Sequence, residues 1–523
     1  MLLLALPCLG MAAVAVAPTA PLAAAVATAA ATPATVLRWL TAARPTPQAL
    51  AVLAQLGAAG DHGLRPDYYD AVSLAQRVRQ LGADPGAAQL ADIDAALSAS
   101  AVRYANDLRR GHVDPRSTGL ALARPRAPVD TAWLGRLAAS PDAAAEFRAL
   151  EPVFVHYRLL QEWLVRYRAL AQQQPTLTAL PPLPARSVKV NGSYAGADAL
   201  RRLLATVGDL PAAQGAARGD GRFDAELSAA VARFQERHGL AADGALGAQT
   251  YTALTTPLSR RVRQIELTLE RWRWVPDFAA PPLIINIPQF RLFAFRSTQD
   301  RVADILQMAV IVGQAYDKKR TPVFIADLQQ VVFRPYWDVP PSILRNELLP
   351  ALRRDPAGYL QRNDMEIVRG QGDDGQVVEP TPANLDALAA GGLRLRQRPG
   401  PKNALGPVKF IFPNDFGVYL HGTPAQQLFA QSRRDFSHGC IRLSDPAALA
   451  VHVLRNVGGG WPLEKVQASM QGEENVRVRL PQPVPVMVLY GTALATEDGR
   501  ILFFDDIYGH DRRLEKLLPA AGA

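Results

Sequence analysis

The pattern of hydrophobic and polar positions changes along the chain and divides it into regions. In the first region apolar residues recur every three or four positions, as in Val102, Ala105 and Leu108. This spacing predicts amphipathic helices. The Pro-rich stretch Leu180–Pro184 then interrupts the helical pattern, and such stretches are typical of linkers. We therefore expect a helical scaffold domain over 32–186.

The next region, 187–257, has the pattern of a small helical module. Ala230 and Phe234 lie on one face of a predicted helix, Gly239 can end that helix in a left-handed conformation, and Asp243-Gly244 predicts a turn. The segment resembles the type 1 peptidoglycan-binding module, a family of small three-helix bundles. The resemblance implies that the module binds glycan strands, and a helical bundle without a ligand remains the alternative.

A third region begins with an amphipathic helix and then changes to β-structure. Val262, Ile265 and Leu269 share one helical face, so we expect 258–280 to return to the scaffold. After Pro281 the apolar residues follow a period of two, which predicts strands. The predicted strands are Leu283–Ile287, Leu292–Phe295, Met308–Val312, Val331–Phe333, Lys409–Phe412, Val418–Leu420 and Val486–Tyr490.

The β-rich domain extends over 281–507 and is interrupted at 341–400. Gly and Pro punctuate the interruption, and only Met365–Val368 has the pattern of a strand. We therefore expect a helical, lid-like insertion over the sheet, and a C-terminal tail at 508–523. The predicted fold class is multidomain α+β, with a helical scaffold, a small three-helix bundle and a β-rich domain that carries a helical insertion.

Length and composition agree with several folded, exported domains. The chain has 523 residues, of which 49% are hydrophobic, so it exceeds what one core supports. The residues up to Ala17 are almost wholly apolar, no charged side chain precedes Arg38, and A-x-A cleavage sites follow. We expect an export signal over 1–31 and a periplasmic protein. Because a basic n-region is missing, an uncleaved membrane anchor and a mis-assigned start remain alternatives.

The charge of the chain bears on its partner. The formal net charge is +9, which favours an anionic partner or reflects a genome-wide composition. No dense Lys/Arg block with interleaved aromatics and no zinc-finger or helix-turn-helix spacing occurs, so we expect no nucleic-acid partner. A bacterial wall polymer with free carboxylates fits the charge.

Cysteine usage points to a single reactive thiol. Cys8 falls inside the predicted signal, which leaves Cys440 alone in the exported chain. A lone cysteine in an exported protein is either buried and inert or retained for its chemistry. The surrounding sequence Ser437-His438-Gly439-Cys440, with His421 upstream, favours chemistry.

Two histidines lie close to Cys440 in the sequence. Cysteine attacks as a thiolate, so a histidine within hydrogen-bond reach has to accept its proton. His421 follows a predicted strand and can face the thiol from there, whereas His438 is only two positions before it. We therefore expect His421 to be the base and His438 to pack or to orient substrate. A zinc site is the alternative, but no carboxylate or second cysteine completes a ligand set.

Two neighbours complete the predicted site. Gly439 lacks Cβ, so the backbone can turn tightly and present the amides of Gly439 and Cys440 to an oxyanion, which stabilises a transition state by roughly 3 kcal/mol. The guanidinium of Arg442 suits a substrate carboxylate. Bracing the loop through backbone carbonyls is the alternative role for Arg442.

These residues resemble the catalytic motif of L,D-transpeptidases of the YkuD fold, in which a His and a spacer precede Ser/Thr-His-Gly-Cys. The resemblance extends to Asn286-Ile-Pro, Val312-Gly313, Arg320-Thr321-Pro322, Pro335 to Pro340 and Asn403 to Gly406. With Gly111 to Pro115 and the binding module, the domain order resembles the large YcbB-like type of this family.

The resemblance implies a ping-pong acyl transfer that forms 3-3 cross-links between peptidoglycan stem peptides through a Cys440 thioester. In such enzymes His421 would move protons, and the carbonyl of Gly422 would orient the imidazole. The substrate-binding residues would be Tyr419, Ser437, His438 and Arg442. The resemblance implies no cofactor or metal, and we expect a monomer whose partners are stem peptides and glycan strands.

The acceptor of the acyl group is left open by the sequence. The same thiol chemistry serves L,D-carboxypeptidases, which hydrolyse, and enzymes that attach a lipoprotein to the wall, because pocket shape selects the acceptor. A non-catalytic murein-binding scaffold is a further alternative, against which the intact pair of Cys440 and His421 speaks.

Overall fold

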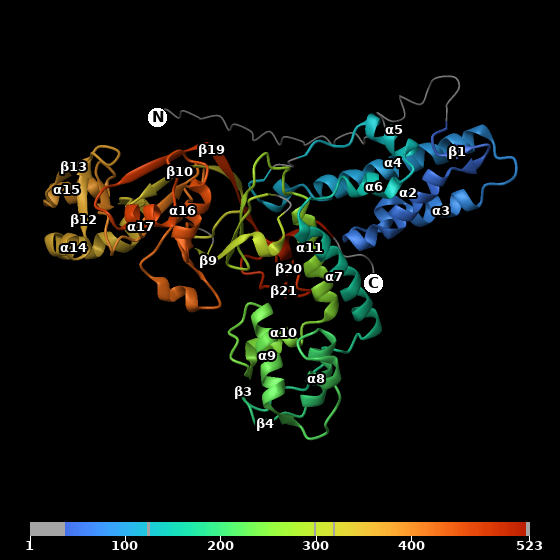
Figure 1. Ribbon diagram of the computed structural model, residues 1–523, viewed down its shortest axis with the longest axis horizontal. Helices are drawn as coiled ribbons and strands as arrows, with labels where there is room; N and C mark the ends of the chain where they lie inside the picture. Colours follow the sequence, from blue (N-terminus) through green and yellow to red (C-terminus); the bar gives the residue numbers. More distant parts are fainter. Residues whose placement is uncertain (1–36, 123–125, 298–299, 317–318, 519–523) are drawn as a thin grey trace, which may run out of the picture. The chain divides into compact units, whose positions relative to one another are not determined.

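The computed structural model describes residues 37–122, 126–297, 300–316 and 319–518 (Figure 1). The predicted export segment therefore lies outside the described residues. The chain forms two compact units that interleave in sequence. The scaffold unit comprises the chain up to Ala58, Pro66–Ala105 and Val129–Ala149, and the remainder forms the catalytic unit. The predicted scaffold region thus contributes residues to both units.

The scaffold unit is helical. Its elements are β1 (Leu40–Thr41), β2 (Arg44–Pro45), α2 (Pro47–Gly57), α3 (Ala71–Arg79), α4 (Ala87–Arg110, which ends in the catalytic unit), α5 (Thr131–Ala139) and α6 (Ala143–Arg148). The side chains of Thr46 and Asp130 accept backbone N–H groups and so cap α2 and α5. Tyr104 contacts Phe147, which contacts Trp133, and this aromatic cluster fills the core.

Two long helices support the catalytic unit, namely α7 (Val155–Gln173) and α11 (Leu258–Trp272). They pack on each other, and Arg168 pairs with Glu266 at 2.6 Å. The fully buried Glu270 accepts the backbone N–H of Val113 at 2.7 Å. The segment Gly111 to Pro115 is thereby fixed to α11, which gives this sequence motif a structural role.

The predicted module is a three-helix bundle, as expected from its sequence. It consists of β3 (Ser187–Val188), β4 (Gly192–Ser193), α8 (Ala197–Thr206), β5 (Arg222–Phe223), α9 (Ala225–Arg237), β6 (Leu246–Gly247) and α10 (Ala248–Leu254). Phe234 packs in its core, and Gly239 follows α9 with φ of +66°. This left-handed conformation is the predicted helix stop.

A nine-stranded sheet forms the core of the catalytic unit. Its strands are β7 (Leu283–Asn286), β8 (Arg291–Ala294), β9 (Leu306–Gly313), β10 (Ile325–Phe333), β15 (Val408–Ile411), β16 (Leu420–His421), β17 (Asp435–Ser437), β18 (Ile441–Leu443) and β19 (Val476–Leu489). The order is β17-β9-β18-β16-β15-β10-β19-β7-β8, and β8 also pairs with β9. This last pairing closes the sheet into a barrel.

The predicted strands all contribute to this barrel, although several boundaries differ. β10 and β19 begin earlier than predicted, at Ile325 and Val476. The sequence predicts a strand over Val418–Leu420, whereas β16 contains only Leu420 and His421. Asn414 explains the difference, because its side-chain amide accepts from the backbone N–H of Val418 and donates to the carbonyl of the same residue. These bonds form a turn that replaces the start of the strand.

The insertion differs from its prediction as a helical segment. Alongside α12 (Pro341–Ile343), a π-helical turn (Leu344–Leu348), α13 (Leu349–Arg354), α14 (Pro356–Arg362) and α15 (Pro382–Ala389), it contains β12 (Met365–Arg369), β13 (Gln376–Val378) and β14 (Arg394–Gln397). These strands and β11 (Trp337–Asp338) form a four-stranded sheet. The strand at Met365 is confirmed, whereas β13 and β14 were missed because they have only three and four residues, too few for an alternation to be recognised.

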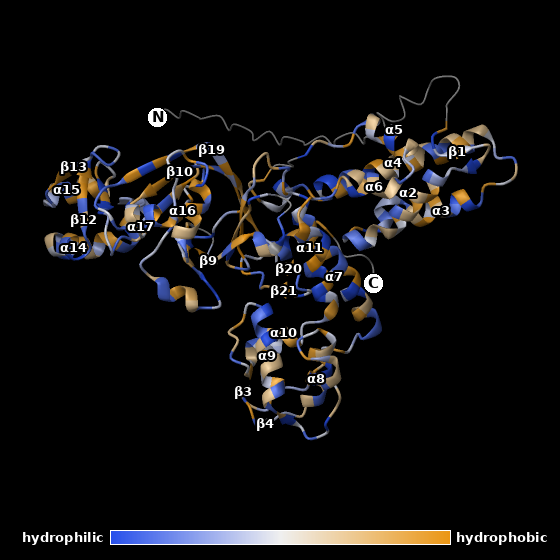
Figure 2. Cartoon of the chain, in the orientation of Figure 1, coloured by the Kyte–Doolittle hydropathy of each residue, from blue (hydrophilic) through white to orange (hydrophobic). Residues whose placement is uncertain are grey.

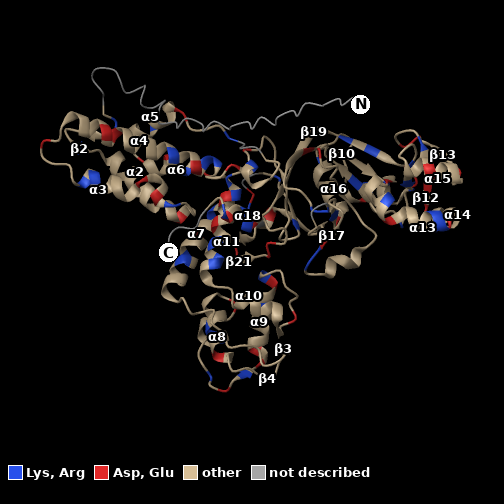
Figure 3. Cartoon of the chain, turned by 180° about the vertical axis from the view of Figure 1, so that it is seen from behind, with Lys and Arg blue, Asp and Glu red and all other residues tan. Residues whose placement is uncertain are grey.

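The rest of the catalytic unit covers the barrel. It comprises α16 (Pro446–Leu454), α17 (Leu463–Gln471), β20 (Ala493–Ala495), β21 (Ile501–Phe503) and α18 (His510–Glu515). Figure 2 shows hydrophobic residues along the barrel strands, which agrees with the burial of Val331 and Val488. Figure 3 shows positive and negative side chains mixed over the elements. Among the described residues, no helix is long and apolar enough to cross a membrane.

Candidate active site

Strand register brings the predicted residues onto one face of the barrel sheet. β16 and β18 are parallel, with Leu420 opposite Ile441 and His421 opposite Arg442. Leu420 and Ile441 are completely buried, so this face of the two strands points into the core. Because side chains alternate along a strand, His421 and Arg442 project from the other face. They line a cleft there together with Tyr419 and Cys440.

The thiol of Cys440 is partly exposed in this cleft. Its Sγ donates to the carbonyl oxygen of Gly417 at 3.9 Å and accepts hydrogen bonds from Tyr419. Burial raises its pKa above the usual value, and the hydrogen bonds from Tyr419 and the charges of Lys409 and Arg442 oppose that shift. Because burial is the largest of these effects, the thiol is protonated at neutral pH. The strand register puts His421 diagonally across from Cys440 on the same face of the sheet.

His421 is buried and held by backbone groups. Its Nδ1 lies 2.5 Å from the carbonyl oxygen of Gly422, so Nδ1 carries the proton and donates it, which leaves Nε2 as the basic nitrogen. Burial, followed by the charge of Arg442, lowers the pKa of His421 to about 3. A neutral imidazole can accept a proton, so His421 rests in the state that a general base requires.

The loop before the thiol is fixed by hydroxyl groups. The Ser437 hydroxyl accepts the amide of Gly439 at 3.1 Å and donates to the carbonyl of Cys440 at 2.5 Å. The Thr321 hydroxyl donates to the carbonyl of Gly439 at 2.8 Å. The amide of Gly439, predicted as an oxyanion donor, is thus occupied by Ser437 in this conformation, and the oxyanion expectation rests on Cys440.

Gly439 has φ of +123°, and a Cβ built there would have only ordinary contacts. Glycine is therefore required by its backbone conformation, since side-chain residues rarely adopt this region. At Gly313 the requirement is space, because a Cβ would overlap the backbone of the segment before Thr321. Sequence analysis gave no role to Thr321, although it lies in a segment that matches the family.

His438 points away from the base and towards the insertion. Its Nε2 lies 2.7 Å from the carboxylate of Glu347, which Lys319 also contacts at 3.2 Å. The hydrogen bond with His438, followed by that with Lys319, lowers the pKa of Glu347. The insertion is therefore linked to the loop that carries Cys440. The sequence did not predict a role for Glu347, because this residue lies in the helical turn Leu344–Leu348, far from the cysteine motif in the sequence and without a motif of its own.

The cleft has a volume of about 840 Å³, within the range of small-molecule sites. One part of its wall is the segment Gly119 to Ala121, which follows the Gly111 to Pro115 motif and which the sequence predicts in the scaffold domain. Arg442 also lines the cleft, and its buried Nε has no hydrogen-bond partner among the described residues. Of its two predicted roles, this favours a substrate anion over bracing of the loop.

A lysine that the sequence analysis left without a role completes the site. Lys409 lies directly opposite His421 in the antiparallel pair of β15 and β16. Its neighbours Val408 and Phe410 are fully buried, so Lys409 projects from the catalytic face. The sequence shows Lys409 between the apolar residues Val408 and Phe410, and this alternation could have indicated that Lys409 lies on the opposite face.

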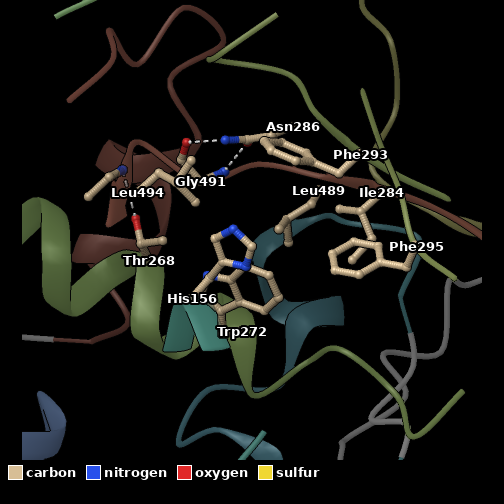
Figure 4. Close-up of a pocket in the computed structure, with 11 residues that line it drawn as sticks. His156, Thr268, Trp272, Ile284, Asn286, Phe293, Phe295, Leu489, Gly491 and Leu494 are labelled. Atoms are coloured by element: carbon tan, nitrogen blue, oxygen red, sulfur yellow. Dashed lines mark hydrogen bonds between the residues drawn. The ribbon is translucent and has the colours of Figure 1, made fainter. Parts of the chain in front are cut away.

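Other sites in the molecule lie apart from this chemistry. A cavity of about 20 Å³ between α7, α11 and the barrel is lined by His156, Trp272 and Asn286 (Figure 4). It contains none of the predicted site residues. Within the described ranges, no group of three or more His, Cys, Asp or Glu side chains is arranged to hold a metal ion.

Comparison with known proteins agrees with the domain order. The model of the L,D-transpeptidase catalytic domain matches 282–467, that of a scaffold domain matches 32–164, and that of a "Putative peptidoglycan binding domain" matches 194–254. A Haemophilus influenzae protein named "Putative L,D-transpeptidase" is 31% identical over 281 residues, which are 53% of this chain and 54% of the relative. The chain thus spans about half the length of that relative. The family resemblance is confirmed: residues 282–467 match the YkuD-type L,D-transpeptidase catalytic domain, and matches to a scaffold domain and a peptidoglycan-binding domain accompany it.

Proposed function

We propose that this protein is an L,D-transpeptidase that forms 3-3 cross-links between peptidoglycan stem peptides. The observation that carries the proposal is the shared face of Cys440, His421 and Arg442 in a cleft of a domain that matches the L,D-transpeptidase model. A thiol, a neutral imidazole and a guanidinium in one cleft supply a nucleophile, a base and an anion-binding group.

In the first half-reaction, His421 takes the proton of Cys440 as Sγ attacks the carbonyl carbon before the terminal D-Ala of a tetrapeptide. The oxyanion that forms is stabilised by the amide of Cys440 and by nearby positive charge. The C–N bond then breaks, the proton goes from the imidazole to the leaving amine, and D-Ala departs. A thioester between Cys440 and the tripeptide acyl group remains.

In the second half-reaction, the side-chain amine of an acceptor diaminopimelate attacks the thioester carbonyl. His421 accepts the amine proton and returns it to Sγ as the C–S bond breaks. Arg442 holds a carboxylate of one peptide, and Tyr419, Ser437 and His438 line the path. The products are a cross-linked dimer and the free enzyme, so no cofactor is consumed.

The binding module and the predicted export signal support the proposal that this activity takes place at the wall. A peptidoglycan-binding domain in the same chain retains the enzyme on its polymeric substrate, which raises the local concentration of stem peptides. We propose that the protein acts in the periplasm as a monomer. A membrane tether at the N-terminus, within 1–31, is the alternative to a cleaved signal.

The test is mass spectrometry of muropeptides after incubation of the protein with disaccharide-tetrapeptides. The proposal predicts dimers together with free D-Ala. Tripeptides without dimers would instead assign an L,D-carboxypeptidase, and products formed only with a lipoprotein would assign wall attachment. No product of any kind would support the non-catalytic scaffold.

A further inference from the structure

We propose that Lys409 is a positioning residue that holds the ring of Tyr419 against the thiol and supplies positive charge to the forming thiolate of Cys440. The inference rests on the proposed function, since it assigns a role in the reaction of that thiol. It extends the site by one residue on β15, a strand that carries none of the predicted catalytic groups.

The first argument is geometric. Lys409 pairs with His421 across β15 and β16, and His421 pairs with Arg442 across β16 and β18. The three side chains therefore form a row over three neighbouring strands, on the face that bears the thiol. The ammonium of Lys409 lies 3.9 Å from the centroid of the Tyr419 ring. This distance is well within the range of a cation–π interaction.

The second argument is that the ammonium is not neutralised by a direct partner. Within the described part of the chain, Lys409 forms no ion pair or hydrogen bond in addition to its ring contact. The two nearest carboxylates are already paired, Asp338 with Arg394 and Asp373 with Arg477. An uncompensated charge next to a partly buried thiol stabilises the thiolate over the thiol.

The third argument is the link from Lys409 to sulfur through Tyr419. The hydroxyl of Tyr419 hydrogen-bonds the thiol, and its ring lies beneath the ammonium. A ring fixed by a cation has fewer orientations, so its hydroxyl stays directed at Sγ. The charge of Lys409 also lowers the pKa of Cys440 directly.

Several charged and titratable groups face Lys409 and Cys440 and can affect how the reactivity of the thiol depends on pH. They are Tyr419, His421, Arg442, Asp338, Asp373 and Arg477. Burial, followed by the charge of Arg442, keeps His421 neutral between pH 5 and 10. A change in the titration of the thiol after substitution of Lys409 can then be attributed to the lysine.

The experiment is the rate of Cys440 alkylation by iodoacetamide between pH 5 and 10, followed by mass spectrometry of the Cys440 peptide. Lys409→Met should slow alkylation about tenfold at each pH below the midpoint of the profile, because the thiolate fraction there falls tenfold when the pKa of the thiol rises by one unit. Lys409→Arg should restore most of the rate, because it keeps the charge and the ring contact. No peptidoglycan is needed, so the result is independent of the acceptor and of the transpeptidase assignment.

Lys465→Met is the matched control. Lys465 also stacks on an aromatic ring, Trp461 at 4.3 Å, but it lies on α17 and outside the cleft. The control should alkylate as the wild type does. An unchanged profile in Lys409→Met, or an equal shift in Lys465→Met, would overturn the proposal. If Lys409→Met fails to fold, Lys409→Gln is measured instead, in the wild type and in the Tyr419→Phe background. A role through the hydroxyl of Tyr419 predicts that Lys409→Gln slows alkylation less in the Tyr419→Phe background than in the wild type. An equal slowing in both backgrounds would contradict that role.

Discussion

The hydroxyl of Ser437 donates to the carbonyl oxygen of Cys440 at 2.5 Å and so fixes the backbone that carries the thiol. The hydroxyl oxygen of Ser437 also accepts a hydrogen bond from the backbone N–H of Gly439. Removal of this one hydroxyl frees two backbone groups of the loop.

Ser437→Ala should lower kcat about 10- to 100-fold with little change in KM, because the thiol loses its fixed position. Steady-state assays with tetrapeptide substrate check this, with Ser437→Thr as the variant that should retain activity. An unchanged kcat in Ser437→Ala would show that the hydroxyl of Ser437 is not needed to position the thiol.

The two histidines should respond differently to substitution. His421→Ala should nearly abolish acyl-enzyme formation, because His421 is the neutral imidazole that β16 places on the face of the thiol. His438→Ala should retain measurable acylation, since His438 binds Glu347. The measurement is the rate of adduct formation by intact mass. The reverse ordering would assign the base to His438.

The ion pair between the insertion and the catalytic loop should affect product choice. Glu347→Gln weakens the contacts with His438 and Lys319, so the insertion should cover the thioester less well and admit water. The ratio of tripeptide to dimer should rise about two- to tenfold, a change in barrier of about 1 kcal/mol. Asp386→Asn is the control, because Asp386 pairs with the exposed Arg353 within the insertion. Equal product ratios in both variants would contradict a covering role.

His156 should make folding stability sensitive to acid. Both of its ring nitrogens lack hydrogen-bond partners among the described residues, and its ring stacks on Trp272 in the cavity of Figure 4. Burial lowers its pKa to about 4. Because the unfolded chain binds this proton more readily, stability should be lost as pH falls below 6.5, by about 2 kcal/mol at pH 5.

Substitution of His156 isolates that contribution from the other buried histidines. His156→Phe keeps an aromatic ring in the apolar cavity but removes the titration. Its free energy of unfolding in urea should fall less between pH 7.5 and pH 5 than that of the wild type. Parallel pH dependences of the two proteins would show that His156 does not titrate on unfolding.

Much of this fold was predictable because local patterns determine it. The barrel strands alternate or form short apolar runs, and Gly239 ends a helix through its own backbone preference. The proximity of Cys440 and His421 could be predicted for the same reason, since both residues belong to one sequence motif. The strand at Val418 was misplaced because a side chain, Asn414, competes with the sheet for its backbone groups.

The remaining features depend on contacts between distant segments. β13 and β14 are held by pairing within a small sheet, and with three and four residues each they are too short to be recognised from their own sequence. Glu347 reaches His438 across 91 positions, and Gly119 joins the cleft from a segment predicted in the scaffold. The occupation of the Gly439 amide by Ser437 is a property of loop geometry that residue types alone do not predict.

The most direct test of the proposed mechanism is the mass of the intact protein during turnover of a disaccharide-tetrapeptide. The account predicts a transient adduct that equals the substrate without its terminal D-Ala and that maps to Cys440 after digestion. Cys440→Ala should form no adduct and no dimer while keeping the wild-type melting temperature, because the thiol is partly exposed and its removal leaves the core intact. Dimer formation by Cys440→Ala, or an adduct on another residue, would contradict the assignment of Cys440 as the nucleophile.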